Sequence, residues 1–386
     1  MRSRMNYRVS STHVFQWAVE WLQAANLIKD HGWLCTAETV WSIVVRAAAR
    51  TISIFAACRD MARAPSQQAV FNALTKGLPR TLPVLERRLN EALAAPLPRC
   101  LLRRRWAVAI DWHLLPYYGE PSRSRNELYR SKQQRGTTRF HAYATACIVQ
   151  SGQRYTLAVV WVRQHESMVT VMKRLLGFLR KMALKIKLLL VDRAFFTAAI
   201  LSLLQQEKIP FLMPVALRGP KPKKPAKKGL RWIQRQKAGW YLHSMTKGSD
   251  DVTFSVCVSY RTYYQRKKRK NQKLLFAAWR VRGTPTEIRE RYRTRFGIET
   301  TYRQMHQARI YTCTRDPHLR LVFVVVGFLL RNLWVWIHAT QLAHSSGRET
   351  KPRLALLRFK QMLEWIAQAV AEIFHDGSIP CVELET

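Results

Sequence analysis

The sequence predicts an α/β protein with a mixed β-sheet and helices, preceded by an N-terminal helical domain and followed by C-terminal helices. Three observations lead to this prediction. Apolar residues recur at helical spacing in the first hundred residues, short apolar segments typical of strands follow from residue 106, and strands then alternate with amphipathic helices up to residue 215. A chain of 386 residues with 48% hydrophobic residues can bury a large core and hold two or three domains.

Residues 1–100 are expected to form a helical DNA-binding domain. Within it, segment 51–77 predicts a helix, a proline-containing break and a second short helix with Ser66 as its N-cap. This is the outline of a helix-turn-helix, whose second helix would enter a DNA groove. An ordinary helical hairpin has the same outline, so that alternative stays open. The side chains offered to base edges would be Gln67, Gln68 and Asn72.

Residues 104–216 are expected to form the first part of the sheet. Three strands joined by turns come first, and they are followed by a helix, a strand, a second helix and a last strand. This order matches the ribonuclease H arrangement, in which antiparallel strands precede parallel ones. The predicted strands are 106–111, 140–149, 155–162, 187–191 and 211–215, and the predicted helices are 167–184 and 197–207.

A basic, β-rich insertion is expected at 217–274. The segments WYLHS and VTFSVCVSY predict strands, and the runs KPKKPAKK and QRKKRKNQK are either solvated loops or surfaces that track DNA. The second part of the ribonuclease H-like core is expected at 275–340 and a helical tail at 341–386. Charged and amide side chains inside the apolar run 319–339 favour a buried core helix over a membrane span.

The charge of the chain indicates a polyanionic partner. Its 65 Lys and Arg against 24 Asp and Glu give a formal net charge of +41, spread along the chain. Nucleic acid is the first candidate, because neutralising phosphates releases counterions, and an anionic membrane surface is the weaker one. Seven scattered cysteines without zinc-site spacing indicate a reducing compartment, and the N-terminal segment does not read as a signal peptide. We therefore expect a cytoplasmic, nucleoid-associated protein with no membrane partner.

Three carboxylates are candidates for one catalytic centre. Asp111 closes the first predicted strand and Asp192 the fourth, and these strands lie side by side in such a sheet. Glu299, from a later helix, would supply the third carboxylate. Three converging acids repel one another unless divalent cations hold them, which predicts two Mg²⁺ ions, with Mn²⁺ as the alternative metal.

A polar stripe surrounds Glu299. On a single helix, Tyr292, Arg295, Glu299, Arg303 and His306 would share one face, with Glu299 as its only carboxylate. Such a face offers donors to a phosphate backbone and one ligand to a metal. The alternative is a solvated helix in which Glu299 pairs with Arg295 or Arg303.

Other side chains compete for roles near these acids. His113 would be either an extra ligand or proton shuttle, or a residue that caps a strand. Glu120 and Glu166 are competing candidates for the third acid. Three aromatic residues would either stack on an extruded base or pack in the core: Trp112, Tyr117 and Tyr118.

At these motifs the chain resembles the DDE transposases of bacterial and archaeal insertion sequences. Tyr292, Arg295 and Glu299 reproduce the spacing of the Tyr-Arg-Glu part of a Tyr-Arg-Glu-Lys signature that marks one branch. The segments LLLVDRAFF and AIDWHLLPYYG are also similar to family motifs, the second most like an archaeal-type subgroup. The basic residue expected seven positions after the glutamate is His306 here, which removes a fixed charge and makes that contact sensitive to pH; Arg303 or Arg309 would compensate.

The resemblance implies a cut-and-paste DNA transposase. Asp111, Asp192 and Glu299 would hold two Mg²⁺ ions, and Tyr292, Arg295 and the His306 position would contact the DNA backbone next to the cleaved end. The reaction would be hydrolysis at the transposon end, followed by attack of the new 3′-hydroxyl on target DNA. The partners would be double-stranded DNA, as terminal inverted repeats and target, and a second copy of the chain, because both ends must be processed together. Two alternatives stay open: a domesticated DNA-binding protein without catalysis, and a ribonuclease H-fold nuclease that cuts but never joins.

Overall fold

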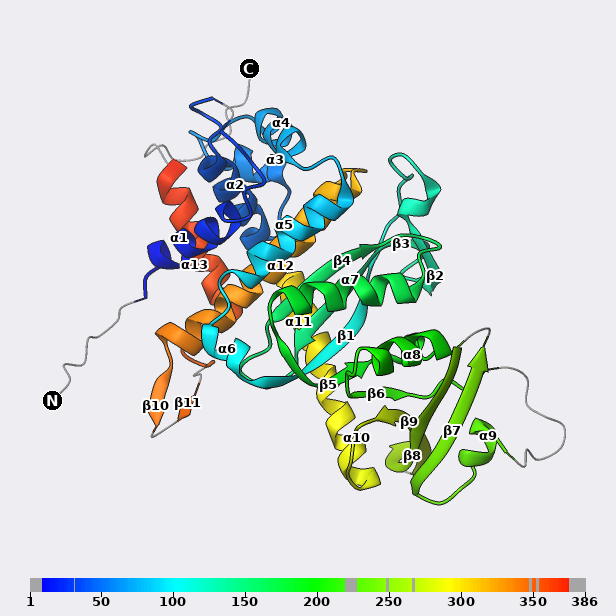
Figure 1. Cartoon of the computed structure of the whole chain (residues 1–386). Coiled ribbons are helices and arrows are strands. Elements are labelled where there is room, and N and C mark those ends of the chain that lie inside the picture. The colour runs from blue at the N-terminus through cyan, green and yellow to red at the C-terminus, as the bar shows by residue number, and fades with distance from the viewer. Residues whose placement is uncertain are drawn as a thin grey trace.

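The computed structural model describes residues 9–30, 32–218, 228–247, 250–265, 268–346, 349–351 and 354–374 (Figure 1). The predicted run KPKKPAKK, apart from its last lysine, lies outside the described residues, as do two residues of QRKKRKNQK and the two ends of the chain. Figure 1 shows a body of helices at one side, a sheet across the middle and a strand-rich part at the other side.

The helical body combines the N-terminal helices with the C-terminal one. Helix α13 (Phe359–Phe374) packs against α1 and α2 (Figure 1), and the Arg46 guanidinium donates to the Ala367 carbonyl at 2.7 Å. The short helices of the predicted helix-turn-helix form with Ser66 as N-cap, and its hydroxyl accepts from the Ala69 amide at 3.3 Å. The N-terminal helices are α1 (Ser11–Gln23), α2 (Ala37–Arg50), α3 (Ile54–Arg59), α4 (Gln67–Gly77), α5 (Leu82–Ala94) and α6 (Arg99–Arg103).

The described residues form a nine-stranded mixed sheet whose strand order confirms the ribonuclease H-like prediction. At its centre β4, β3 and β1 are antiparallel neighbours, and β5 and β6 continue from β1 in parallel. Strand β4 is buried along its whole length, and β5 is buried over its last three residues, as expected for a sheet covered on both faces. Their bounds are β1 (Arg105–Pro116), β3 (Thr137–Ile148), β4 (Thr156–Val162), β5 (Lys185–Val191) and β6 (Phe211–Pro214).

The strands between the basic runs extend this same sheet. The long hairpin of β8 (Asp250–Gln265) and β9 (Lys268–Trp279) joins it through β9, which pairs antiparallel with β6 from Phe211 opposite Trp279. Strand β7 (Gly239–Lys247) forms the edge, and a short helix, α9 (Leu230–Ile233), precedes it. The predicted return of a strand to the core near residue 274 is therefore part of β9.

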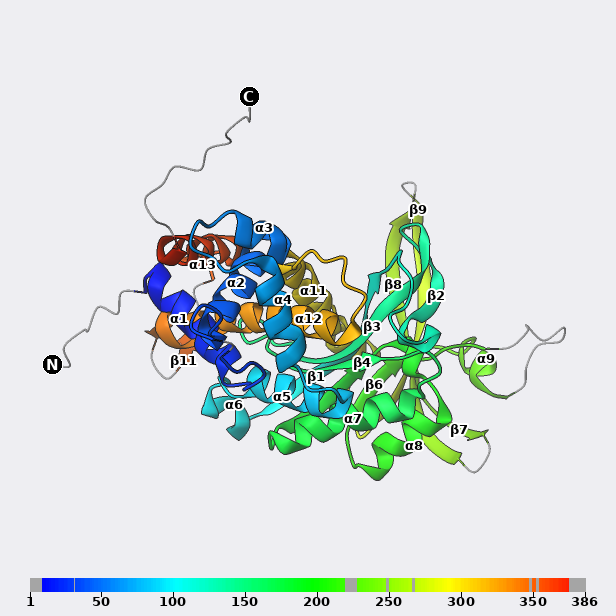
Figure 2. The same cartoon turned by 90° about the horizontal axis from the view of Figure 1, so that it is seen from above.

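Helices cover both faces of the sheet, as the view from above shows (Figure 2). Helices α7 (Met168–Lys181) and α8 (Ala198–Gln206) lie on one side, and α11 (Gly297–Met305) and α12 (Pro317–Trp336) on the other. The side of a β1 residue follows from its contacts: Trp112 stacks on Phe195 just before α8, while His113 stacks on Tyr302 of α11. Asp111 alternates with Trp112 and therefore faces the α11 side.

Helix α12 runs between the helical body and the sheet. Among the described residues, one helix, Pro317–Gln341 with its terminal π-turn, is long and apolar enough to cross a membrane, and 94% of its most apolar stretch is buried inside the protein. Asn332, within this helix, uses both polar atoms of its side-chain amide. Its Oδ1 accepts from the Thr156 amide at 2.9 Å, and its Nδ2 donates to the Thr156 carbonyl at 2.7 Å. This agrees with the predicted core helix.

Four sequence predictions need correction. The first strand does not end at Asp111 but continues to Pro116, because β3 pairs with it over that whole length. A further strand, β2 (Tyr129–Gln134), precedes β3. The predicted single helix around Glu299 is split into α10 (Pro285–Arg293) and α11 by a 3₁₀ turn at Thr294–Phe296. The predicted helical tail begins instead with a small hairpin, β10 (His344–Ser346) and β11 (Glu349–Lys351).

Candidate active site

Asp111 and Asp192 lie next to each other on adjacent strands. The last parallel pair of β1 and β5 joins Ile110 to Val191, so the next residue on each chain segment is one of the two aspartates. The carboxyl edge of parallel strands is where ligands bind in open α/β sheets.

Backbone amides orient both carboxylates. The Trp112 amide donates to Asp111 Oδ1 at 2.9 Å, and the Ala194 amide donates to Asp192 Oδ2 at 3.0 Å. Asp192 thereby caps the 3₁₀ turn Arg193–Phe195. Both side chains are held before any ligand arrives.

Glu299 is presented by α11. A capping box starts the preceding helix α10, with the Thr284 hydroxyl accepting from the Glu287 amide and the Glu287 carboxylate accepting from the Thr284 amide. Helix α11 then docks on β3 through a buried hydrogen bond of 2.6 Å between the hydroxyls of Tyr302 and Thr145. This contact fixes the helix that carries Glu299 against the sheet.

Arg295 lies between the three acids. Its Nη1 donates to Asp111 Oδ2 at 2.7 Å and its Nη2 donates to Glu299 Oε1 at 3.1 Å, while Asp192 Oδ1 lies 3.9 Å from Nη2. The Arg295 side chain is only 8% exposed, whereas those of Asp111, Asp192 and Glu299 are 14%, 34% and 47% exposed. One buried guanidinium therefore gathers three carboxylates that come from two strands and a helix.

The electrostatics of this cluster follow from its burial. Burial raises the pKa of the Asp111 carboxyl to about 6; Arg295 opposes that shift, and the charge of Asp192 adds to it. Burial acts to lower the pKa of Arg295, but Tyr292 and the three acids outweigh it, so the pKa of the guanidinium lies above its ordinary value. Arg295 remains charged and is the counter-ion of the acids.

The donor set suits a hard divalent cation. Three carboxylates that already face one positive group are the oxygen ligands that Mg²⁺ and Mn²⁺ prefer. In the part of the chain that the structure describes, no group of three or more His, Cys, Asp or Glu side chains lies close enough to hold an ion as the side chains stand. The acids meet instead through the Arg295 guanidinium. Arg295 thus supplies in this form the positive charge that cations would supply.

Comparison with known proteins decides the family. Residues 102–333 match the model of the transposase DDE domain, which is more than half of the chain. The chain belongs to this family. Transposition of DNA is the function that the family supports, and DDE transposases generally use divalent metal ions.

The solved structures agree with this transposase fold. A piggyBac transposase in a synaptic complex with hairpin DNA, seen by cryo-electron microscopy, is similar to this chain with a TM-score of 0.54 and 12% sequence identity. The similarity covers 96% of this chain and 82% of that one. At this identity the likeness concerns the fold alone. No curated protein matches the chain by sequence.

The remaining members of the predicted stripe are separated by the 3₁₀ turn of this transposase chain. Tyr292 is 8% exposed, and its phenol donates to the Val191 carbonyl at 3.3 Å, which anchors α10 beside Asp192. Arg303 is exposed, and the His306 ring lies 5.0 Å from the ring of buried His113. Contact of these residues with DNA stays a prediction.

The competing acids have other partners. Glu120 pairs with Arg139 at 2.9 Å, and Glu166 pairs with Arg174. Of the aromatic candidates, Trp112 packs between Tyr129 and Phe195, buried Tyr117 donates to the Glu120 carbonyl, and Tyr118 is 70% exposed. The exposed helix-turn-helix side chains Gln68 and Asn72 share a hydrogen bond of 3.0 Å, and Gln67 is exposed beside them.

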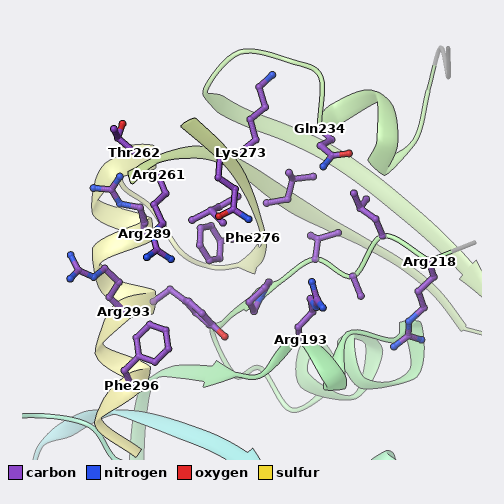
Figure 3. A pocket seen from close by; sticks show the side chains of 18 residues that line it. Arg193, Arg218, Gln234, Arg261, Thr262, Lys273, Phe276, Arg289, Arg293 and Phe296 are labelled. Carbon is purple, nitrogen blue, oxygen red and sulfur yellow. The ribbon is translucent and has the colours of Figure 1, made fainter. Parts of the chain in front are cut away.

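A basic cavity of about 950 Å³ lies beside α10, and Figure 3 shows the side chains that line it. Tyr292 and Arg193, the residue after Asp192, both line it, so it lies directly beside the catalytic candidates. None of the described lining residues is acidic, and Phe276 and Phe296 add aromatic surface. Its basic side chains are Arg193, Arg218, Arg261, Lys273, Arg289 and Arg293.

Sequence reasoning did not select these cavity residues. Arg289 and Arg293 are four residues apart on α10, on a face offset from the predicted stripe, and this spacing was the available signal. Arg218, Arg261 and Lys273 come from segments beyond β6, and only the fold brings them to the same cavity.

Proposed function

We propose that this DDE transposase performs cut-and-paste transposition of an insertion sequence, with Asp111, Asp192 and Glu299 as its catalytic acids. The observation that carries the proposal is the convergence of these three carboxylates on Arg295 at the carboxyl edge of β1 and β5. The reaction is cleavage at the transposon end to leave a 3′-hydroxyl, followed by in-line attack of that hydroxyl on target DNA.

The three acids would hold two Mg²⁺ ions, with Mn²⁺ as a substitute. When bound, such ions activate the attacking oxygen and stabilise the departing one. The chain's own residues prepare this site. Amide hydrogen bonds aim Asp111 and Asp192, the Tyr302 hydroxyl fixes α11 on the sheet, and Arg295 keeps the acids together until cations and phosphate arrive.

Double-stranded DNA is the proposed partner, as terminal inverted repeats and target. The net charge of +41 and the basic cavity beside the acids support this, because each phosphate neutralised by Lys or Arg releases counterions. We further propose that the exposed Gln67, Gln68 and Asn72 of α4 read bases within a helical DNA-binding domain at 1–100. Alanine at these three positions should relax sequence preference while leaving non-specific binding intact.

The finer assignments rest on the sequence motifs. The Tyr292, Arg295 and Glu299 spacing supports the branch with the Tyr-Arg-Glu-Lys signature in bacterial or archaeal insertion sequences, with His306 at its final position. Arg303 is exposed at the end of α11 and is the nearby cation proposed to contact the backbone. Because both transposon ends must be processed together, the proposed working form is a homodimer on DNA. Its proposed location is the cytoplasm, at the nucleoid.

A DNA cleavage assay tests the proposal. Wild type should cut DNA that carries the element's ends in the presence of Mg²⁺, and Glu299→Gln should bind the same DNA but cut at least about a hundredfold more slowly. Glu91→Gln on α5, an exposed acid paired with Arg87, is the control and should cut normally. Equal cutting by Glu299→Gln would reject the assignment, and cutting without joining would favour a plain nuclease.

A further inference from the structure

A second group of arginines lies behind the active site, on the far side of α11. Arg331 from α12 and Arg154 from the turn between β3 and β4 both line a small pocket of about 60 Å³. Gln304 at the end of α11 and the exposed Ser151 and Leu354 complete its wall and its mouth. The pocket is separate from the three acids and from the basic cavity beside them.

Arg331 is a buried charge with no counter-ion among the side chains that the structure describes. It is 2% exposed, and its Nη1 has no hydrogen-bond partner, while its Nε donates to Gln304 Oε1 at 3.3 Å. The Nε of Arg154 is also buried and unpartnered. Among the described residues, no acidic side chain forms an ion pair with either arginine.

The neighbouring titratable groups do not supply the missing negative charge. Cys147 and Tyr155 face Arg331, but burial raises the pKa of both groups, so the thiol and the phenol stay protonated at neutral pH. Arg154 adds a second positive charge instead. A buried guanidinium without a counter-ion costs several kcal/mol, so buried Arg331, with half-buried Arg154 beside it, favours binding of an anion.

We propose that this pocket binds a phosphate-type oxyanion. The guanidinium groups of Arg331 and Arg154, which line the pocket, are the donors, and their planar shape matches the oxygens of a phosphate. A volume of about 60 Å³ holds one tetrahedral oxyanion or a few water molecules. The occupant is either a free phosphate or a phosphate of a DNA backbone, since the pocket opens to solvent.

Binding there would fasten both ends of α11. Arg331 holds Gln304 at the end of this helix, and Arg154 Nε lies 3.0 Å from the position that a Cβ would take at Gly297, its first residue. Glu299 lies between these two points. An occupied pocket therefore stiffens the helix that presents the third acid.

Thermal unfolding of the full chain tests the site, with chloride replaced by inorganic phosphate at constant ionic strength. Wild type should gain Tm with a saturable dependence on phosphate, and Arg154→Gln should bind phosphate about tenfold more weakly or not at all. Arg331→Met should also lose the response, and it should be no less stable than wild type without phosphate, because it removes an unpaired buried charge. Arg87→Gln, an exposed arginine on α5, is the matched control and should respond as wild type does.

A second arm distinguishes the two sources. If a DNA backbone supplies the phosphate, duplex DNA rather than free phosphate should stabilise wild type. Arg154→Gln should then lower the salt slope of DNA binding by about the amount expected for one phosphate contact. If neither the phosphate response nor the DNA salt slope differs between Arg154→Gln and Arg87→Gln, the proposal is overturned.

Discussion

Replacing Arg295 by methionine should destabilise the protein in a way that depends on pH. Methionine keeps the apolar stem but removes hydrogen bonds of 2.7 Å to Asp111 and 3.1 Å to Glu299. Asp111 and Arg295 are 14% and 8% exposed, so little of their interaction is screened by water. Removing one partner of such a buried pair costs about 3–5 kcal/mol. Glu299 is 47% exposed and should contribute little to that cost.

The pH dependence follows from Asp111. Its pKa of about 6 lies above the ordinary value of 3.8, so Asp111 contributes most stability below about pH 4. As pH rises through 6, that contribution of roughly 3 kcal/mol to the free energy of unfolding of wild type is lost. Without Arg295 the pKa of Asp111 rises further. The variant should therefore lose most free energy of unfolding, relative to wild type, at pH 8 and least at pH 5, where Asp111 is largely protonated.

Urea denaturation of wild type and Arg295→Met at pH 5 and pH 8 measures this difference. Arg303→Met, an exposed arginine on α11, is the control and should unfold like wild type at both pH values. Added Mg²⁺ should recover more stability in Arg295→Met than in wild type, since the ion replaces the lost positive charge among the acids. Equal losses at pH 5 and pH 8, with no effect of Mg²⁺, would refute this account of the cluster.

Three further predictions concern acid stability, DNA binding and the core helix. Burial lowers the pKa of His141 to about 3, so the neutral ring contributes stability above about pH 6.5, and this contribution is lost as pH falls. Between about pH 7.5 and 5, His141→Gln should therefore lose about 2 kcal/mol less free energy of unfolding than wild type. Equal losses in the two proteins would contradict this. Arg193→Gln and Arg293→Gln should each lower the salt slope of DNA binding by about 0.9, and an unchanged slope in a filter-binding titration would exclude both residues from phosphate contact. Asn332→Leu leaves the buried backbone amide and carbonyl of Thr156 without their Asn332 partners, so it should lower the free energy of unfolding by about 2–4 kcal/mol in urea denaturation. A decrease below about 1 kcal/mol would show that other groups bond the Thr156 amide and carbonyl.

The central sheet was predictable because local signals and topology agree. Apolar strands such as β5 end where the hydrophobic run ends, so Asp192 follows directly from sequence. The strand β1 was predicted too short because the residues after Asp111, WHLLP, do not alternate polar and apolar side chains and end in proline, and pairing with β3 keeps them extended. Strand β2 is polar and largely exposed, with no pattern that distinguishes it from a loop.

The candidate site was predictable as a set of acids but not as a geometry. Helical periodicity treats residues 289–309 as one continuous helix, whereas a 3₁₀ turn at Thr294–Phe296 rotates Tyr292 toward Val191 and carries Arg295 inward. Periodicity alone cannot reveal that Arg295 is buried among three acids, because two of those acids come from strands more than a hundred residues earlier. The arginine pair behind α11 is likewise a product of long-range packing.

The central claim is that Asp111, Asp192 and Glu299 act together as metal ligands in DNA cleavage. Cysteine at position 192 tests it most directly, because a thiolate binds Mg²⁺ poorly and softer divalent ions such as Mn²⁺ better. Asp192→Cys should bind transposon-end DNA, fail to cut it in Mg²⁺ and regain cutting in Mn²⁺. Cutting in Mg²⁺ at the wild-type rate, or no recovery in Mn²⁺ by a folded, DNA-binding variant, would contradict the claim.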